Sequence, residues 1–135
     1  MFSRIDYSQL NPRQKENYNF HKVAARLADY GFNSLRLTDD WEGAEFIAIH
    51  IDGETYLKVQ LKGRLAIDRK YQGKGIHIAF LHGDDLYLYD HDAFVQFLQS
   101  TNKIEADSVT WHEHGRRSWK IPPVWAIAYL EDFRV

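Results

Sequence analysis

The sequence lacks cysteine altogether and has only three prolines and one methionine in 135 residues. Without cysteine, disulfides, thiolate zinc sites and cysteine nucleophiles are excluded, and the composition fits a reducing compartment such as the cytoplasm. No apolar run approaches the roughly 20 residues of a membrane-spanning helix, and the first residues lack the apolar core of a signal peptide. We therefore expect a cytoplasmic protein that does not associate with a membrane.

The net charge is also small, because 17 Lys and Arg residues against 19 Asp and Glu residues give a formal charge of −2 at pH 7. Any surface for nucleic acid would have to be a local patch, since the chain as a whole is not basic. Hydrophobic residues make up 44% of the chain and aromatic residues 15%, which suits one packed core and excludes a disordered chain. We expect one domain over residues 1–135.

A helix is predicted near the start of the chain, because Asn11 can cap it, Pro12 suits its first position and Gln14 can complete a capping box. Apolar residues then recur at helical spacing as far as Gly31, which predicts a helix over about 12–30. Further along, the predicted strands are 32–37, 45–51, 54–62, 76–81 and 86–89. The later helices are one capped by Asp90 or Asp92 and ending near Gln99, and one over 124–133.

The segments between these elements are predicted to be irregular. Residues 38–43 form a polar connection, and residues 63–75 form a basic loop. Three tryptophans in the last third of the chain, where periodicity is weak, are expected to pack over the core: Trp111, Trp119 and Trp125. The order of elements predicts a mixed α/β sandwich layered as helix, sheet, helix.

The most informative segment is a predicted hairpin around Asp52-Gly53. This pair between apolar runs favours a two-residue type I′ turn, since both central residues of that turn need positive φ. Counting outward from such a loop, Glu45 faces Gln60, and Lys62 shares their face of the sheet. A three-residue loop over 52–54 would instead turn Gln60 and Lys62 to the other face.

In the first register, a carboxylate, an amide oxygen and an ammonium group project from one patch. Carboxylate and amide oxygens suit a hard divalent cation such as Mg²⁺ or Mn²⁺, and the ammonium of Lys62 can stabilise charge on a phosphate. Glu16 lies one turn before Phe20, at the edge of the helix's apolar stripe, and would add a second carboxylate. The alternatives are a cross-strand ion pair between Glu45 and Lys62, and a solvated helix residue at Glu16.

With Glu16 on a helix, Glu45 opening a hairpin and Gln60-Leu61-Lys62 on the return strand, the chain resembles the PD-(D/E)XK nuclease superfamily, and within it a small subset with glutamine in the motif. The resemblance covers about residues 12–100 and leaves a tryptophan-rich extension over 101–135. It implies a restriction-endonuclease-like three-layer sandwich, in which a mixed central sheet with an αβββ(α)β core is flanked by helices.

The resemblance also implies a function. A member of this superfamily would be a Mg²⁺- or Mn²⁺-dependent endonuclease acting on DNA, with Glu45, Gln60 and Lys62 as catalytic residues and with Glu45, Gln60 and Glu16 as metal ligands. Such small nucleases often act as homodimers. The chain departs from the superfamily where Glu45 replaces the usual aspartate, with Asp40 as the alternative acid, and where Gln60 replaces an acid. These departures leave a catalytically inactive module that binds nucleic acid or a protein as the second interpretation.

Basic residues after the motif are candidates for holding DNA phosphates, because backbone contacts give affinity without reading sequence. They are Arg64, Arg69, Lys70 and Lys74. A rival metal site is His112-Glu113-His114, where alternate residues of a strand would point two imidazoles the same way, although no third ligand at a suitable spacing supports zinc there. A third interpretation is a protein-interaction domain that uses the tryptophan-rich extension.

Overall fold

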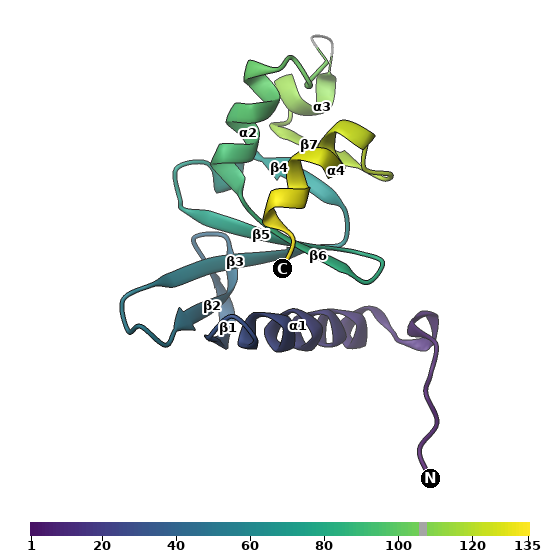
Figure 1. Cartoon of the computed structure of the whole chain (residues 1–135). Helices are drawn as coiled ribbons and strands as arrows, with labels where there is room; N and C mark the ends of the chain where they lie inside the picture. The colour runs from purple at the N-terminus through teal and green to yellow at the C-terminus, as the bar shows by residue number, and fades with distance from the viewer. Residues whose placement is uncertain (106–107) are drawn as a thin grey trace.

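The computed structural model, which describes residues 1–105 and 108–135, has three layers (Figure 1). A five-stranded sheet in the order β1-β2-β3-β5-β6 forms the middle layer. Helix α1 lies against one face, and α2, α4 and a two-stranded ribbon of β4 and β7 cover part of the other. The mixed α/β sandwich predicted from the sequence is therefore confirmed.

The strands are β1 (Phe32–Trp41), β2 (Ala44–His50), β3 (Tyr56–Lys62), β4 (Leu65–Asp68), β5 (Ile76–His82), β6 (Asp85–Asp90) and β7 (Arg116–Trp119). The helices are α1 (Pro12–Ala28), α2 (His91–Ser100), α3 (Val109–His112) and α4 (Val124–Leu130), with short 3-10 turns η1 (Tyr7–Gln9), η2 (Arg69–Tyr71) and η3 (Glu131–Phe133). No helix among the described residues is both long and apolar enough to cross a bilayer.

Helix α1 begins as the sequence predicts. Asn11 caps it and forms a capping box with Gln14, and Pro12 occupies the first turn. Its buried stripe packs on one face of the sheet and forms a core with strand residues Phe46, Ala48, Val59, Ala79 and Leu86; the helix contributes Phe20, Val23 and Leu27. This packing fixes α1 beneath the β2–β3 hairpin.

The hairpin has the predicted register but not the predicted turn. Phe46 pairs with Val59 and Ile49 with Tyr56, and the same count places Glu45 opposite Gln60. The last pair of the ladder is closed by the His50 N–H, which donates to the Thr55 carbonyl, so the loop has four residues rather than two. A type I′ turn is wrong because Gly53 alone has positive φ there. The Asp52 side chain instead accepts from the Glu54 and Thr55 N–H groups.

Strand β1 runs further than predicted. Residues 38–41, expected in a polar connection, continue the strand, and Trp41 pairs with Ala44 after an irregularity that follows Arg36. Polar residues are tolerated because β1 is the edge of the sheet and its outer residues face solvent.

The segment 63–75 is not a simple loop, contrary to the prediction. It contains β4 and η2, and it forms the crossover between the parallel strands β3 and β5, a place that an α-helix usually takes. The reason is a long-range partner: Leu65 and Ile67 are buried on one side of β4, and β4 pairs with β7 from the end of the chain.

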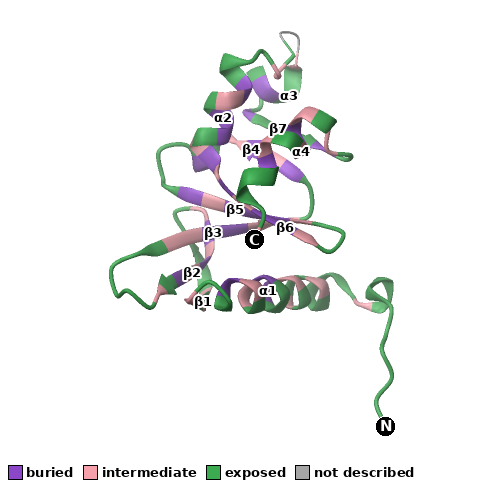
Figure 2. Ribbon diagram, in the orientation of Figure 1, coloured by how far each residue is buried: buried purple, intermediate pink, exposed green. Residues whose placement is uncertain are grey.

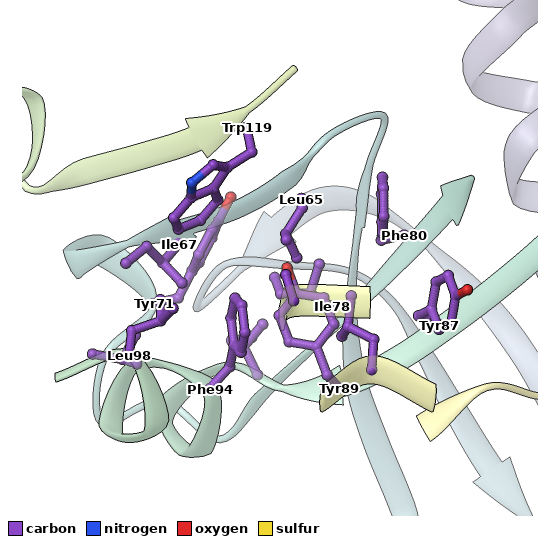
Figure 3. Packing of buried hydrophobic residues seen from close by; sticks show 14 of the residues in the cluster. Leu65, Ile67, Tyr71, Ile78, Phe80, Tyr87, Tyr89, Phe94, Leu98 and Trp119 are labelled. Carbon is purple, nitrogen blue, oxygen red and sulfur yellow. The ribbon is translucent and has the colours of Figure 1, made fainter. Parts of the chain in front are cut away.

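The second core lies on the opposite face of the sheet from α1 (Figure 3). It joins β5 and β6 to α2 and the ribbon, and the last third of the chain contributes the buried Trp111 and Trp119 while Trp125 packs beside them. The extension over 101–135 thus packs over the core as predicted. Within it, His112 lies on helix α3, so the alternating strand geometry proposed for a His112–His114 zinc site is wrong.

Candidate active site at the open end of the β2–β3 hairpin

Glu45 and Gln60 meet at the start of β2 and near the end of β3. The Gln60 Nε2 donates to the Glu45 Oε1 at 2.5 Å, and Gln60 is only 8% exposed. The partner of the Glu45 carboxylate is therefore the amide and not, as one alternative had it, the Lys62 ammonium. The three-residue loop that would have separated these side chains does not form.

The amide of Gln60 has one unsatisfied side. Its Oε1 is buried and accepts no hydrogen bond from any residue that the structure describes. A buried acceptor without a donor costs free energy, and such atoms in folded proteins usually mark a place for a water or an ion. This oxygen, beside a carboxylate, has the chemistry of a ligand for a hard cation.

The Glu45 carboxyl has a raised pKa, chiefly because it is partly buried. The Gln60 hydrogen bond and the charges of Lys62 and Arg36 act in the opposite direction, while the nearby Glu16 carboxylate raises the pKa further. A metal ion bound beside Glu45 would stabilise the ionised form of its carboxyl group, which burial disfavours.

Glu16 and Lys62 line the same groove as Glu45. The ammonium of Lys62 lies 5.3 Å from the centre of the Tyr71 ring, which packs beneath it. Glu16 is exposed on α1 and is held at the site only through the position of the helix. Glu16, Glu45 and Lys62 therefore lie around one opening. Gln60 is buried and does not line the groove; it joins the site through its hydrogen bond to Glu45.

Two residues at this site were not predicted. Arg36 of β1 shares a smaller recess with Glu16, Asp40 and Glu45, and Tyr71 lies under Lys62. The alternative acid Asp40 accepts from the Gly43 N–H at 2.7 Å, so it holds the β1–β2 turn while facing that recess. The sequence carries no signal for Tyr71, because its position depends on β4 pairing with a distant strand.

The predicted phosphate-binding residues differ in their surroundings. Arg64 and Lys74 are exposed. The Arg69 guanidinium lies over Trp111, 4.9 Å from the ring centre, and the Lys70 ammonium lies 5.1 Å from the centre of Tyr71 and 3.9 Å from an Asp68 oxygen. All four remain candidates for binding nucleic acid.

A divalent metal fits these residues only with help from water or substrate. Among residues 1–105 and 108–135, no group of three or more His, Asp or Glu side chains is arranged to hold a metal ion. Mg²⁺, however, commonly uses one or two carboxylates and keeps several waters. Glu45 and Glu16 line the same groove, so the two carboxylates that such a site would need are present on its wall.

No protein-family model and no curated protein matches the chain. A search of solved structures matches a bacterial homing endonuclease, I-Ssp6803I, with 18% sequence identity and a TM-score of 0.47, covering 63% of this chain and 69% of that one.

Proposed function

We propose that the protein is a nuclease that uses Mg²⁺ or Mn²⁺ to hydrolyse phosphodiester bonds in DNA at the Glu45–Gln60–Lys62 site. The observation that carries the proposal is the pairing of Glu45 with the buried Gln60, which leaves the amide oxygen free beside a carboxylate whose pKa is raised. A site with no function would be expected to satisfy both groups internally.

Each residue has a separate role in this proposal. Glu45 and the Gln60 Oε1 hold the cation, and Glu16 adds a carboxylate directly or through water. When bound, the metal lowers the pKa of a water ligand and neutralises charge on the phosphate. Lys62, held over Tyr71, stabilises negative charge that develops on the phosphoryl oxygens. The amide is a neutral ligand, so we expect weaker Mg²⁺ binding than at a site with three acids.

The test compares metal-dependent cleavage by wild type, Lys62→Ala and Lys58→Ala. Lys58 is a matched control because it lies on the same strand and face, and its ammonium also lies over an aromatic ring, 5.4 Å from the centre of Trp41. Plasmid and oligonucleotide DNA are incubated with Mg²⁺ or Mn²⁺. We expect Lys62→Ala to lower the rate by roughly 100-fold or more and Lys58→Ala to leave it nearly unchanged.

Two results would contradict the proposal. Cleavage that survives Lys62→Ala would reject the assigned mechanism. DNA binding without cleavage in either metal, together with no calorimetric uptake of Mn²⁺, would favour the inactive binding module. The homodimer that the resemblance implies remains a prediction, for which light scattering with and without DNA is the measurement.

A further inference from the structure

A groove of about 810 Å³ leads away from the candidate active site along α1. One wall consists of α1 residues on a single helical stripe, and the other consists of the apolar ends of β3, β5 and β6. The stripe includes Asn19, Lys22 and Arg26, and the apolar wall includes Leu61, Leu81 and Leu86. Figure 1 shows α1 running beneath these strands towards η1, at the N-terminal end of the chain.

Two tyrosines line this groove and belong to neither hydrophobic core. The rings of Tyr7 and Tyr18 lie 5.2 Å apart at 60°, and the residues are 41% and 40% exposed. The ammonium of Lys15 lies 5.3 Å from the centre of Tyr7, and that of Lys22 lies 5.3 Å from the centre of Tyr18. Asn19 donates to the Tyr7 hydroxyl at 3.1 Å and so fixes the pair against the helix.

The basic side chains along the groove differ in whether they already have hydrogen-bond or ion-pair partners. Arg26 is engaged by the carbonyls of Val135 and Asp84. Lys22 and Lys62 form no ion pair with any described residue. The acids on the groove are Glu16 and Glu45 at the candidate metal site and Asp84 at the far wall. The two unpaired ammonium groups therefore both line the groove, with Lys62 beside the candidate metal site and Lys22 on the α1 wall between Glu16 and Arg26.

Exposed aromatic rings next to lysines and an apolar wall are the features of a site for single-stranded nucleic acid. Bases stack on aromatic rings, and the ammonium groups attract the phosphates between them. A duplex keeps its bases stacked inside and offers them only through its grooves. The groove between α1 and the sheet is closed on two sides, which suits a single strand.

We propose that this groove binds a short single-stranded stretch of DNA, with one base stacked on Tyr18 and the backbone passing Lys22 towards Lys62. The inference rests on the proposed nuclease function and deepens it: the preferred substrate has unpaired nucleotides next to the bond that is cut, as in a flap, a tail or a single strand.

The experiment measures binding without metal, so that it does not depend on cleavage. Fluorescence anisotropy in EDTA at low salt compares a labelled single strand of about 12 nucleotides with a blunt duplex of the same sequence. We expect wild type to prefer the single strand. Tyr18→Ala should lower that affinity roughly tenfold, and Tyr18→Phe should keep it. Tyr30→Ala is the matched control, because Tyr30 is an exposed tyrosine beyond the end of α1 and outside the groove.

The outcomes separate this proposal from the nuclease proposal. Equal binding of both DNAs, or single-strand binding that Tyr18→Ala leaves unchanged, would overturn the groove as a single-strand site even if cleavage is observed. Tyr18-dependent binding of the single strand without cleavage in either metal would support the groove and reject the catalytic proposal. A thermal melt of each variant confirms that exposed-residue changes leave the fold intact.

Discussion

At the scale of single residues, the notable feature is a half-buried carboxylate whose hydrogen-bond partner is uncharged. Glu45 has Gln60 beside it where a lysine or arginine would have lowered its pKa more strongly. The arrangement costs free energy in the metal-free protein, because burial disfavours the ionised acid. Functional sites commonly keep such a cost, since the groups are arranged for a ligand and not for stability.

We predict that Glu45→Gln stabilises the metal-free protein by about 1 kcal/mol at neutral pH. An acid whose pKa is higher in the folded than in the unfolded state destabilises the fold while it is ionised. The gain should therefore shrink as pH falls through the raised pKa towards the ordinary value of 4.5. Urea unfolding at a series of pH values measures it.

The same variant gives a control with metal. Mn²⁺ should raise the free energy of unfolding of wild type, since it binds only the folded state, and should have little effect on Glu45→Gln. Equal stabilisation of both proteins by Mn²⁺ would show that Glu45 is not a ligand.

At the scale of elements, the site depends on the close contact between the β1–β2 turn and η2. Gly43 has φ +90°, and a Cβ at this position would lie 2.7 Å from the Tyr71 Cδ1. Tyr71 in turn lies under Lys62. The β1–β2 turn at Gly43 therefore limits where the Tyr71 ring can lie, and this ring packs against the proposed catalytic Lys62.

We predict that Gly43→Ala destabilises the protein by more than Gly53→Ala. Both positions have positive φ, so both substitutions should cost about 1–2 kcal/mol in backbone strain. Only Gly43 has a neighbour in the way, whereas nothing lies within 4 Å of a Cβ at Gly53. The overpacking should add roughly 1–3 kcal/mol and lower cleavage activity. Urea unfolding and the cleavage assay measure the two effects, and equal losses in both variants would contradict the contact with Tyr71.

Elements that depend on neighbours in the chain could be predicted from the sequence. The cap of α1 and the register of the hairpin follow from local residues, and the register brings Glu45 to Gln60 even though the loop differs from a type I′ turn. The predicted loop has two residues and the observed loop has four, and both are centred on Asp52-Gly53. The strand residues therefore pair in the same register, and Glu45 still faces Gln60. Strand β4 could not be predicted, because four residues inside the basic segment 63–75 become a strand only through their pairing with distant β7.

At the scale of the whole molecule, the two faces of the sheet have separate cores. The core beneath α1 supports the hairpin, and the larger core on the other face is completed by the last third of the chain (Figures 2 and 3). Central strands contribute to both, as when Ile78 faces one core and Ala79 the other. Because the sheet is shared, loss of packing on one face should weaken the whole protein.

We predict that Trp119→Ala destabilises the protein by about 3–5 kcal/mol, because Trp119 is 7% exposed and packs in the larger core. Trp41→Ala is the control, since Trp41 is 48% exposed on the edge strand, and should cost about 1 kcal/mol or less. Unfolding followed by circular dichroism and by fluorescence should give a single transition in each protein. Two separate transitions in wild type would contradict the shared sheet.

The pairing of β4 with β7 has a consequence for the order in which the protein matures. Leu65 pairs with Trp119, so β4 leaves the ribosome well before its partner strand exists. The hairpin and α1 can pack during synthesis, whereas η2, which follows β4, waits for β7. Tyr71 therefore reaches its position under Lys62 last. We expect a nascent chain that has not yet exposed β7 to carry a folded hairpin whose Tyr71 is not yet fixed beside Lys62.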